Sequence, residues 1–216
     1  MLGFAIQKGR NSFKEEIAII HYSIMNKIPY KFYKNKEDVP INYIPVGSVE
    51  WCEQFLNKDI IIPDYYPQFL NQYLFRKIWK TNKWPTEKVF IKPADHFKKF
   101  TGFVIKEDSK KNRGNFWCSE VVNFENEWRY YISNSKVVAA EWYKGNNEQL
   151  EAPKLNIVFP DNYCAAIDFG ILDNGNLALV EAHLPYACGW YGKNYNIYAE
   201  WIINGWNYIK LIGGCI

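Results

Sequence analysis

The sequence predicts an α+β protein in which a small N-terminal α/β lobe, residues 1–85, precedes an antiparallel-sheet region, residues 86–216, that ends in a helix. Three observations predict this fold class. Apolar residues recur at helical spacing in the first third of the chain, short strand-like runs dominate after Val89, and a helical stretch rich in Trp and Tyr closes the chain. No internal repeat and no low-complexity linker interrupts this order.

The first lobe is expected to alternate helices with a strand. Ser12 fits the N-cap of a capping box, and the helix that it starts continues at apolar spacing until Pro29 closes it. A strand is expected over residues 41–46. Ser48 then fits the N-cap of a second helix, and a third helix is expected over residues 67–80.

The second region is expected to be built from short strands and hairpins. The expected strands span residues 89–92, 103–106, 117–122, 127–133 and 136–142, and a helix is expected over residues 195–211. Asn134-Ser135 fits the turn between the last two strands. These elements predict a mostly antiparallel sheet covered by a closing helix.

The stretch AAIDFGILDNGNLALVEAH, residues 165–183, predicts a hairpin with a two-residue type I′ turn at Asn174-Gly175. Counting back from this turn pairs Leu172 with Leu177, Gly170 with Leu179, Asp168 with Glu181 and Ala166 with His183. Because side chains alternate between faces, Asp168, Glu181 and His183 project to one side. The other side is the core face, formed by Ile167, Phe169, Ile171, Ala178, Val180 and Ala182.

The acids of this hairpin pose an electrostatic problem, because like charges directly opposite one another destabilise a sheet. A divalent cation would reverse that effect. Carboxylate oxygens suit Mg²⁺ or Mn²⁺, and Mn²⁺ also tolerates imidazole. A solvent-exposed face on which the two acids repel only weakly is the alternative, and the spacing alone leaves both interpretations open.

Composition excludes several classes of protein. The 48% hydrophobic and 23% charged content of the 216 residues is typical of a globular protein. A net charge of +3 without a long Lys/Arg block argues against a nucleic-acid partner. The 18% aromatic content is compatible with base stacking, but core and cleft lining is the favoured interpretation.

Cysteine spacing and hydropathy indicate a reducing compartment. The five cysteines are scattered with no C-x-x-C spacing, which argues against a disulfide framework or a zinc site. The N-terminus lacks a basic segment followed by an apolar run, and no run of about 18 apolar residues occurs. A soluble, cytoplasmic protein without a membrane partner is therefore expected.

Six short motifs follow one another in a fixed order over about residues 76–192. They are FIKP at 90–93, KKFTG at 98–102, SEVVNFENEWR at 119–129, KVVAAEWYKG at 136–145, IDFGILDNGNLALVEAH at 167–183 and GWYG at 189–192. In this order they resemble the ATP-grasp family, in particular its compact bacterial and phage domains. The resemblance implies an ATP-grasp-like fold in which two sheets grip a nucleotide.

The resemblance implies that several basic residues contact phosphate. Lys92 and Lys98 take the positions of two phosphate-binding cations, with Lys99 as the rival of Lys98. Arg129 resembles the family's arginine that holds the γ-phosphate or the acyl phosphate, so Arg129 and Lys98 are the candidate catalytic residues. Arg76, expected on the third helix, is a further candidate contact. Ordinary surface lysines and an Arg–Glu surface pair are the alternatives.

The resemblance also implies the nucleoside and metal contacts. The segment 120–123 resembles the hinge between the two sheets, where the C=O of Val121 and the N–H of Asn123 would contact adenine beside Glu120 and the apolar Val122. Glu127 takes the ribose-hydroxyl position. The candidate metal ligands are Asp168 and Glu181, and His183 stands where the family usually has Asn. Its imidazole would ligate the metal or orient a neighbouring carboxylate.

The function that the resemblance implies is an ATP-dependent carboxylate–amine ligase that works through an acyl phosphate. ATP and Mg²⁺ (or Mn²⁺) are the implied cofactors, and the partners would be small-molecule or peptide carboxylates and amines. The alternative is a nucleotide-binding or interaction module of ATP-grasp fold that has lost or altered its ligase activity. His183 and the small first lobe motivate this alternative. The sequence identifies neither the substrates nor the oligomeric state.

Overall fold

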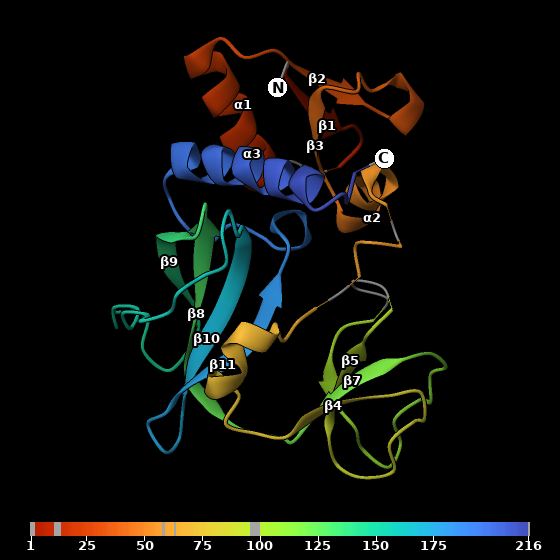
Figure 1. The fold of residues 1–216 in the computed structure, drawn as a ribbon, viewed down its shortest axis with the longest axis vertical. Helices are drawn as coiled ribbons and strands as arrows, with labels where there is room; N and C mark the ends of the chain where they lie inside the picture. The colour runs from red at the N-terminus through yellow and green to blue at the C-terminus, as the bar shows by residue number, and fades with distance from the viewer. Residues whose placement is uncertain (1–2, 11–13, 58, 63, 96–99, 216) are drawn as a thin grey trace.

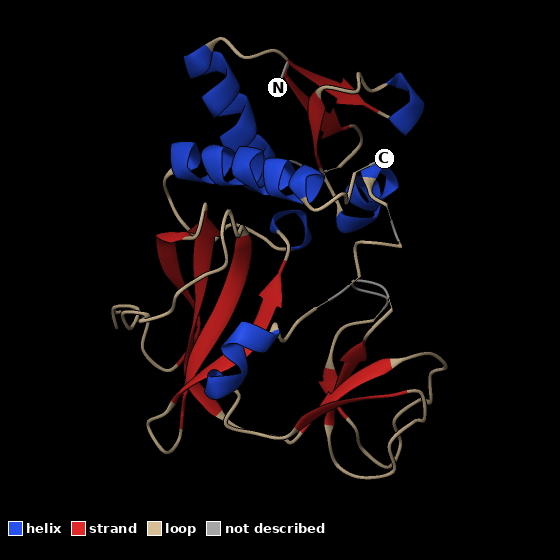
Figure 2. Cartoon of the chain, in the orientation of Figure 1, coloured by secondary structure: helices blue, strands red, loops and turns tan. Residues whose placement is uncertain are grey.

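The computed structural model describes residues 3–10, 14–57, 59–62, 64–95 and 100–215. Three sheets organise these residues, one parallel and two antiparallel. Figure 1 shows the parallel sheet at one end of the molecule and the two antiparallel sheets side by side at the other, with the long C-terminal helix lying between them. The mixture of helices and antiparallel sheets confirms the expected α+β class (Figure 2).

The N-terminal lobe is a three-stranded parallel sheet of order β2-β1-β3. Its elements are β1 (Gly3–Gln7), α1 (Lys14–Asn26), β2 (Tyr30–Tyr33), the 3₁₀ turn η1 (Lys36–Asp38) and β3 (Tyr43–Val46). The sequence predicted only the last of these strands. β1 has four buried residues in succession, as in a parallel strand covered on both faces, so it lacks the alternation that identifies an amphipathic strand. Ser12 lies outside the described residues.

The second predicted helix is confirmed at its start. Ser48 is the N-cap of α2 (Val49–Cys52), and its hydroxyl accepts the Trp51 N–H at 3.1 Å. The 3₁₀ turn η2 (Glu53–Phe55) extends it.

The helix expected over residues 67–80 is wrong in its second half. The 3₁₀ helix η3 (Gln68–Tyr73) occupies the first half, and Ile78–Thr81 form strand β4. Phe75 has a φ of 46°, a left-handed conformation that a right-handed helix cannot continue through. Arg76 therefore lies in the bend between η3 and β4 rather than on a helix.

The second sheet has the order β4-β7-β5-β6 and is antiparallel. Its strands are β4 (Ile78–Thr81), β5 (Phe90–Pro93), β6 (Phe103–Val104) and β7 (Phe116–Ser119). A small core of its own, which includes Ile91 and Phe116, supports it. β4 precedes the expected boundary at residue 85 but pairs with β7, which follows it. The division at that residue stays a prediction.

The third sheet has the order β11-β10-β8-β9 and is also antiparallel. Its strands are β8 (Phe124–Ser133), β9 (Lys136–Gly145), β10 (Ala165–Leu172) and β11 (Leu177–His183). The 3₁₀ turn η4 (Pro185–Ala187) leads from it to α3 (Tyr195–Leu211), which has the predicted bounds. The Asn194 side chain caps α3, and the Trp201 indole donates to the Ile132 carbonyl at 2.9 Å, which fixes the helix on the sheet.

The turn of the β10–β11 hairpin differs from the predicted type I′ turn. That turn needs a positive φ at both central residues, but of Asn174 and Gly175 only Gly175 has one, at 81°. The Leu172 carbonyl accepts the Gly175 N–H at 2.8 Å, and the Leu172 N–H donates to the Asn176 carbonyl at 2.9 Å. The loop therefore has three residues, 173–175, and it shifts the pairing by one residue relative to the prediction.

A β-bulge at Val180 shifts the pairing back. Phe169 pairs with Leu179 and Asp168 pairs with Glu181, so Val180 is the extra residue between two paired positions. The predicted pairing of Asp168 with Glu181 is thereby confirmed, whereas the predicted pairing of Gly170 with Leu179 is wrong. Leu179, not Val180, takes the core position beside Phe169, and both are fully buried.

Two further expectations concern cysteines and membrane spans. All five cysteines are free thiols, as their spacing predicted. None of the helices in the described part of the chain combines the length and the apolar composition that crossing a bilayer requires.

Candidate functional site

The centre of the site is a buried ion pair between Asp168 and Arg129. Strand pairing places the two residues side by side on β10 and β8. The guanidinium donates from Nε to Oδ1 and from Nη2 to Oδ2, both at 2.7 Å, in a bidentate arrangement. Asp168 is 1% exposed and Arg129 is 7% exposed. Burial alone would lower the pKa of Arg129, but the charge of Asp168 outweighs it and raises this pKa.

Glu181, the partner of Asp168 across the hairpin, has cationic and imidazole neighbours of its own. The Lys92 ammonium forms an ion pair with Oε2, and His183 Nε2 lies 2.8 Å from Oε1. Burial alone would raise the pKa of Glu181, but Lys92 and His183 hold it well below its usual range. The Lys92 side chain is nearly buried, and its Nζ lies 4.1 Å from the centre of the Tyr65 ring.

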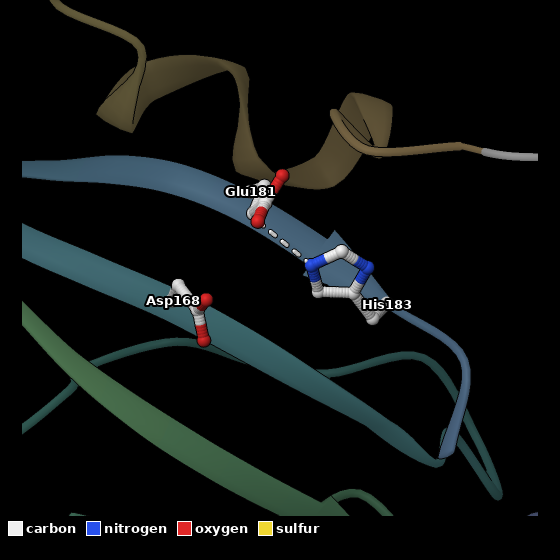
Figure 3. Close-up of side chains that lie close together, drawn as sticks. All are labelled: Asp168, Glu181 and His183. Atoms are coloured by element: carbon white, nitrogen blue, oxygen red, sulfur yellow. Dashed lines mark ion pairs between the residues drawn. The ribbon is translucent and has the colours of Figure 1, made fainter. Parts of the chain in front are cut away.

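Asp168, Glu181 and His183 form a set of metal-ligand types. Each offers one ligand atom, and these atoms lie within 4.8 Å of one another. Figure 3 shows Asp168 on one strand, with Glu181 and His183 paired on the neighbouring strand. Ion-pair partners take one position on each carboxylate oxygen, and an ionised carboxylate has about four lone-pair positions. The donor set therefore fits a divalent cation such as Mg²⁺ or Mn²⁺.

The imidazole of His183 is held on both sides. Its Nε2 faces Glu181, and its ring packs edge-on against Tyr65 at a centroid distance of 5.7 Å. Its Nδ1 is buried and has no hydrogen-bond partner among the described residues. This geometry suits the predicted role of orienting the Glu181 carboxylate.

Glu127 lies on the same face of the third sheet as Arg129 and is buried. Its Oε2 accepts the Tyr143 hydroxyl at 2.6 Å, and its Oε1 is 2.5 Å from the Lys144 ammonium. Burial raises the pKa of Tyr143, and the charges of Asp168 and Glu127 raise it further. The carboxylate thus has two protein partners where the resemblance predicts a ribose hydroxyl, and that contact stays a prediction.

An aromatic pair borders the site beside Arg129. The rings of Tyr143 and Tyr191 stack with centroids 5.1 Å apart and planes 9° from parallel. The guanidinium carbon of Arg129 lies 5.5 Å from the first ring and 5.0 Å from the second. The Gly189 carbonyl accepts from Arg129 and from the Tyr131 hydroxyl, which ties the chain before Tyr191 to the same arginine.

The segment 120–123 joins β7 of the second sheet to β8 of the third, as predicted for a hinge. The Glu120 carboxylate accepts the Lys77 N–H at 2.8 Å, and the Glu120 N–H donates to the Lys77 carbonyl at 3.0 Å. These bonds hold the two inter-sheet connections together. Val121 is exposed, and the predicted adenine contacts of Val121, Val122 and Asn123 stay predictions.

The remaining predicted phosphate contacts have different outcomes. Lys98 and its rival Lys99 lie outside the described residues. Arg76 lies near the site but donates to backbone: Nη1 to the Leu179 carbonyl at 2.6 Å, and Nη2 to the Val180 carbonyl at 3.1 Å. Its phosphate contact stays a prediction.

Sequence reasoning missed Tyr65, Tyr143 and Lys144. The expected strand ended at residue 142, and its continuation to Gly145 would have placed Lys144 opposite Glu127. No sequence pattern indicates that Tyr65 packs against Lys92 and His183, because this contact joins separate sheets.

Comparison with known proteins supplies a family. An ATP-grasp domain family, described as family 2 of its clade, matches residues 69–201, more than half of the chain. This range contains every candidate site residue named above except Tyr65. No curated protein matches the chain in sequence.

Solved structures show the same fold at low sequence identity. The N5-carboxyaminoimidazole ribonucleotide synthetase from Thermotoga maritima matches with a TM-score of 0.53 and 12% identity, over 94% of this chain and 76% of that one. A RimK domain protein ATP-grasp from Sphaerobacter thermophilus DSM 20745 matches with a TM-score of 0.51 and 7% identity, over 94% and 98%. The chain spans only 54% of the ATP-grasp ligase PsnB, with a TM-score of 0.38 and 12% identity over 60% of its own length.

Proposed function

Because this chain belongs to the ATP-grasp domain family, we propose that it is an ATP-dependent ligase that joins a carboxylate to an amine through an acyl phosphate. The carboxylate substrate would attack the γ-phosphate of ATP and release ADP. The amine would then displace phosphate from the acyl phosphate. Small molecules and peptides are the substrate classes of this proposal.

The observation that carries the proposal is the ion pair between Lys92 and Glu181. Lys92 lies on β5 of the second sheet and Glu181 on β11 of the third, so this pair joins the two sheets at the face that also holds Asp168 and Arg129. Two acids and two cations at such a junction suit a polyphosphate with its metal ion. Phosphate would replace Glu181 as the partner of Lys92, and the metal would replace Lys92 as the partner of Glu181.

The candidate ligands of Mg²⁺ or Mn²⁺ are Asp168 and Glu181, with His183 as a ligand or as the residue that orients Glu181. A bound divalent ion supplies charge neutralisation on the transferring phosphoryl group. The protein fits this role because both carboxylates are already fixed by charged partners, which lowers the cost of orienting them.

Arg129 has the donor geometry for the transferred group. Its Nη1 donates only to the Gly189 carbonyl at 3.3 Å, a longer bond than the two to Asp168. A planar donor held by a carboxylate and by two tyrosine rings keeps its position while negative charge develops nearby. Lys98 is proposed as the second cation of this step.

The test is ADP release from ATP and Mg²⁺ across a panel of amino acids, peptides and small carboxylic acids, each with and without an amine. We expect ADP release that depends on one carboxylate, and a hydroxamate product when hydroxylamine replaces the amine. The Glu181→Gln variant is the negative control, and Glu125→Gln, which changes an exposed acid, is the matched control. Tight ATP binding without ADP release over the whole panel would contradict the ligase and favour a nucleotide-binding module.

A further inference from the structure

β11 depends on a bulge to present Glu181 correctly. The pairing next to the turn has Phe169 opposite Leu179, and if it continued without a bulge it would bring Val180 opposite Asp168. Glu181 would then lie opposite Ile167 and point into the core, because a one-residue slip moves every side chain to the other face. The single extra residue at Val180 therefore decides whether the acid pair exists.

The same bulge lies on the outer edge of the sheet. β11 is an edge strand, so the carbonyls and N–H groups of its outer side have no neighbouring strand to bind. The segment between Tyr65 and Arg76 covers this edge: the Tyr65 carbonyl accepts the Ala182 N–H at 2.9 Å, and η3 packs along the strand. Figure 3 shows η3 passing over the strand that carries Glu181.

Arg76 binds the bulge itself. One guanidinium donates to the carbonyls of Leu179 and Val180, the two residues at which the pairing shifts, at 2.6 and 3.1 Å. It also donates to the Leu74 carbonyl at 3.1 Å, which anchors it to its own segment. The guanidinium is packed near the rings of Tyr66 and Phe124. A rigid fork of donors can hold successive carbonyls in a geometry that a single ammonium cannot reproduce.

We infer that Arg76 is a positioning residue for the acid pair: its guanidinium holds the Val180 bulge and thereby keeps Glu181 opposite Asp168. It acts on the metal-binding face through the backbone of β11. This inference rests on the proposed function for its importance to catalysis, but the effect on strand register is independent of that function. It differs from the phosphate contact expected for Arg76, in which the residue would touch the nucleotide.

A deletion separates the two roles. If Val180 is removed, Leu179 remains opposite Phe169 and the next residue, Glu181, falls opposite Asp168 in a regular ladder without a bulge. All faces of β11 are then preserved, and no clamp is needed. Deletion of Val180 should therefore rescue an Arg76 variant if Arg76 holds the bulge, and should have no such effect if Arg76 contacts phosphate.

The experiment compares Arg76→Met, Arg76→Lys, deletion of Val180, and the deletion combined with Arg76→Met, with Arg113→Met as a control at an exposed arginine. Two quantities are measured in the full chain: cross-strand proton contacts by NMR, which report the register directly, and Mn²⁺ affinity by electron paramagnetic resonance. We expect Arg76→Met and Arg76→Lys to lose contacts between Asp168 and Glu181 and to bind Mn²⁺ about tenfold more weakly. The deletion alone and the combined variant should retain both properties.

Several results would overturn the inference. Wild-type register and Mn²⁺ affinity in Arg76→Met would do so, as would weaker binding of metal-free ATP in Arg76→Met that the deletion of Val180 fails to restore. If Arg76→Met does not fold, recovery of folded protein on deletion of Val180 is the expected rescue, and no recovery contradicts it. A wild-type protein that releases no ADP, with a register that still responds to Arg76→Met, would refute the ligase and leave this inference intact.

Discussion

Asp168 and Glu181 face one another across the β10–β11 hairpin, although two one-residue shifts separate them from a regular ladder. The three-residue loop 173–175 moves the pairing by one position, and the Val180 bulge moves it back. The two irregularities cancel at the acid pair and nowhere nearer the turn. The hairpin therefore holds its carboxylates through a balance of two local features, each of which can be altered separately.

The loop depends on Gly175. Its φ of 81° is left-handed, and an added Cβ would meet no atom within 4 Å, so the cost of a side chain there is conformational rather than steric. We expect Gly175→Ala to lower the free energy of unfolding by about 1–2 kcal/mol, measured by urea titration. Gly175→Asn should cost less, because Asn tolerates this conformation. Equal stability of Gly175→Ala and wild type would contradict the assigned loop.

The ion pair of Asp168 and Arg129 should be essential to stability as well as to the site. Asp168→Asn leaves the Arg129 charge buried without its partner, which costs about 3–5 kcal/mol. Urea unfolding measures this loss. The double variant with Asp168→Leu and Arg129→Met should recover most of the stability, because apolar residues can replace a buried ion pair with little loss. Wild-type stability of Asp168→Asn would show that solvent reaches the arginine.

Glu181 should make the stability of the metal-free protein depend on pH. Burial alone would raise its pKa, but Lys92 and His183 hold it well below the ordinary value of 4.5. The unfolded chain then binds more protons than the folded one below about pH 4.5, so stability present above this pH is lost as the pH falls towards the depressed folded pKa. Thermal unfolding across this range should show a shallower loss for Glu181→Gln, whereas Glu125→Gln, at an exposed acid, should follow the wild type.

Local chemistry made parts of the fold predictable. The Ser48 cap depends on its own hydroxyl and the Trp51 N–H, and α3 has an Asn194 cap and an apolar stripe, so both starts were found correctly. The loop length was not predictable, because Asn-Gly fits a two-residue turn as well as the end of a three-residue loop. The Val180 bulge was not predictable either, because its carbonyls are held by Arg76.

The candidate site shows the same division. The acid pair followed from strand alternation within one hairpin, which is a local pattern. The cations that neutralise it are fixed by tertiary structure: Lys92 arrives from another sheet, and Arg129 lies next to Asp168 because β8 and β10 pair. Sequence identified both residues through the family resemblance but indicated phosphate as their partner. Their contacts with Asp168 and Glu181 required the packing of the sheets.

His183 tests whether the departure from the family's usual Asn matters. Its Nε2 lies 2.8 Å from Glu181 Oε1, a contact that the side-chain amide of Asn can also make as a donor. An amide also offers an oxygen, the ligand type that Mg²⁺ prefers. We therefore expect His183→Asn to preserve or raise Mg²⁺-dependent ADP release and to reduce any advantage of Mn²⁺ over Mg²⁺, measured as the ratio of kcat/KM with the two ions. His183→Ala, which removes both ligand and donor, should lower activity with either ion. A complete loss in His183→Asn would instead assign the imidazole a role that an amide cannot fill.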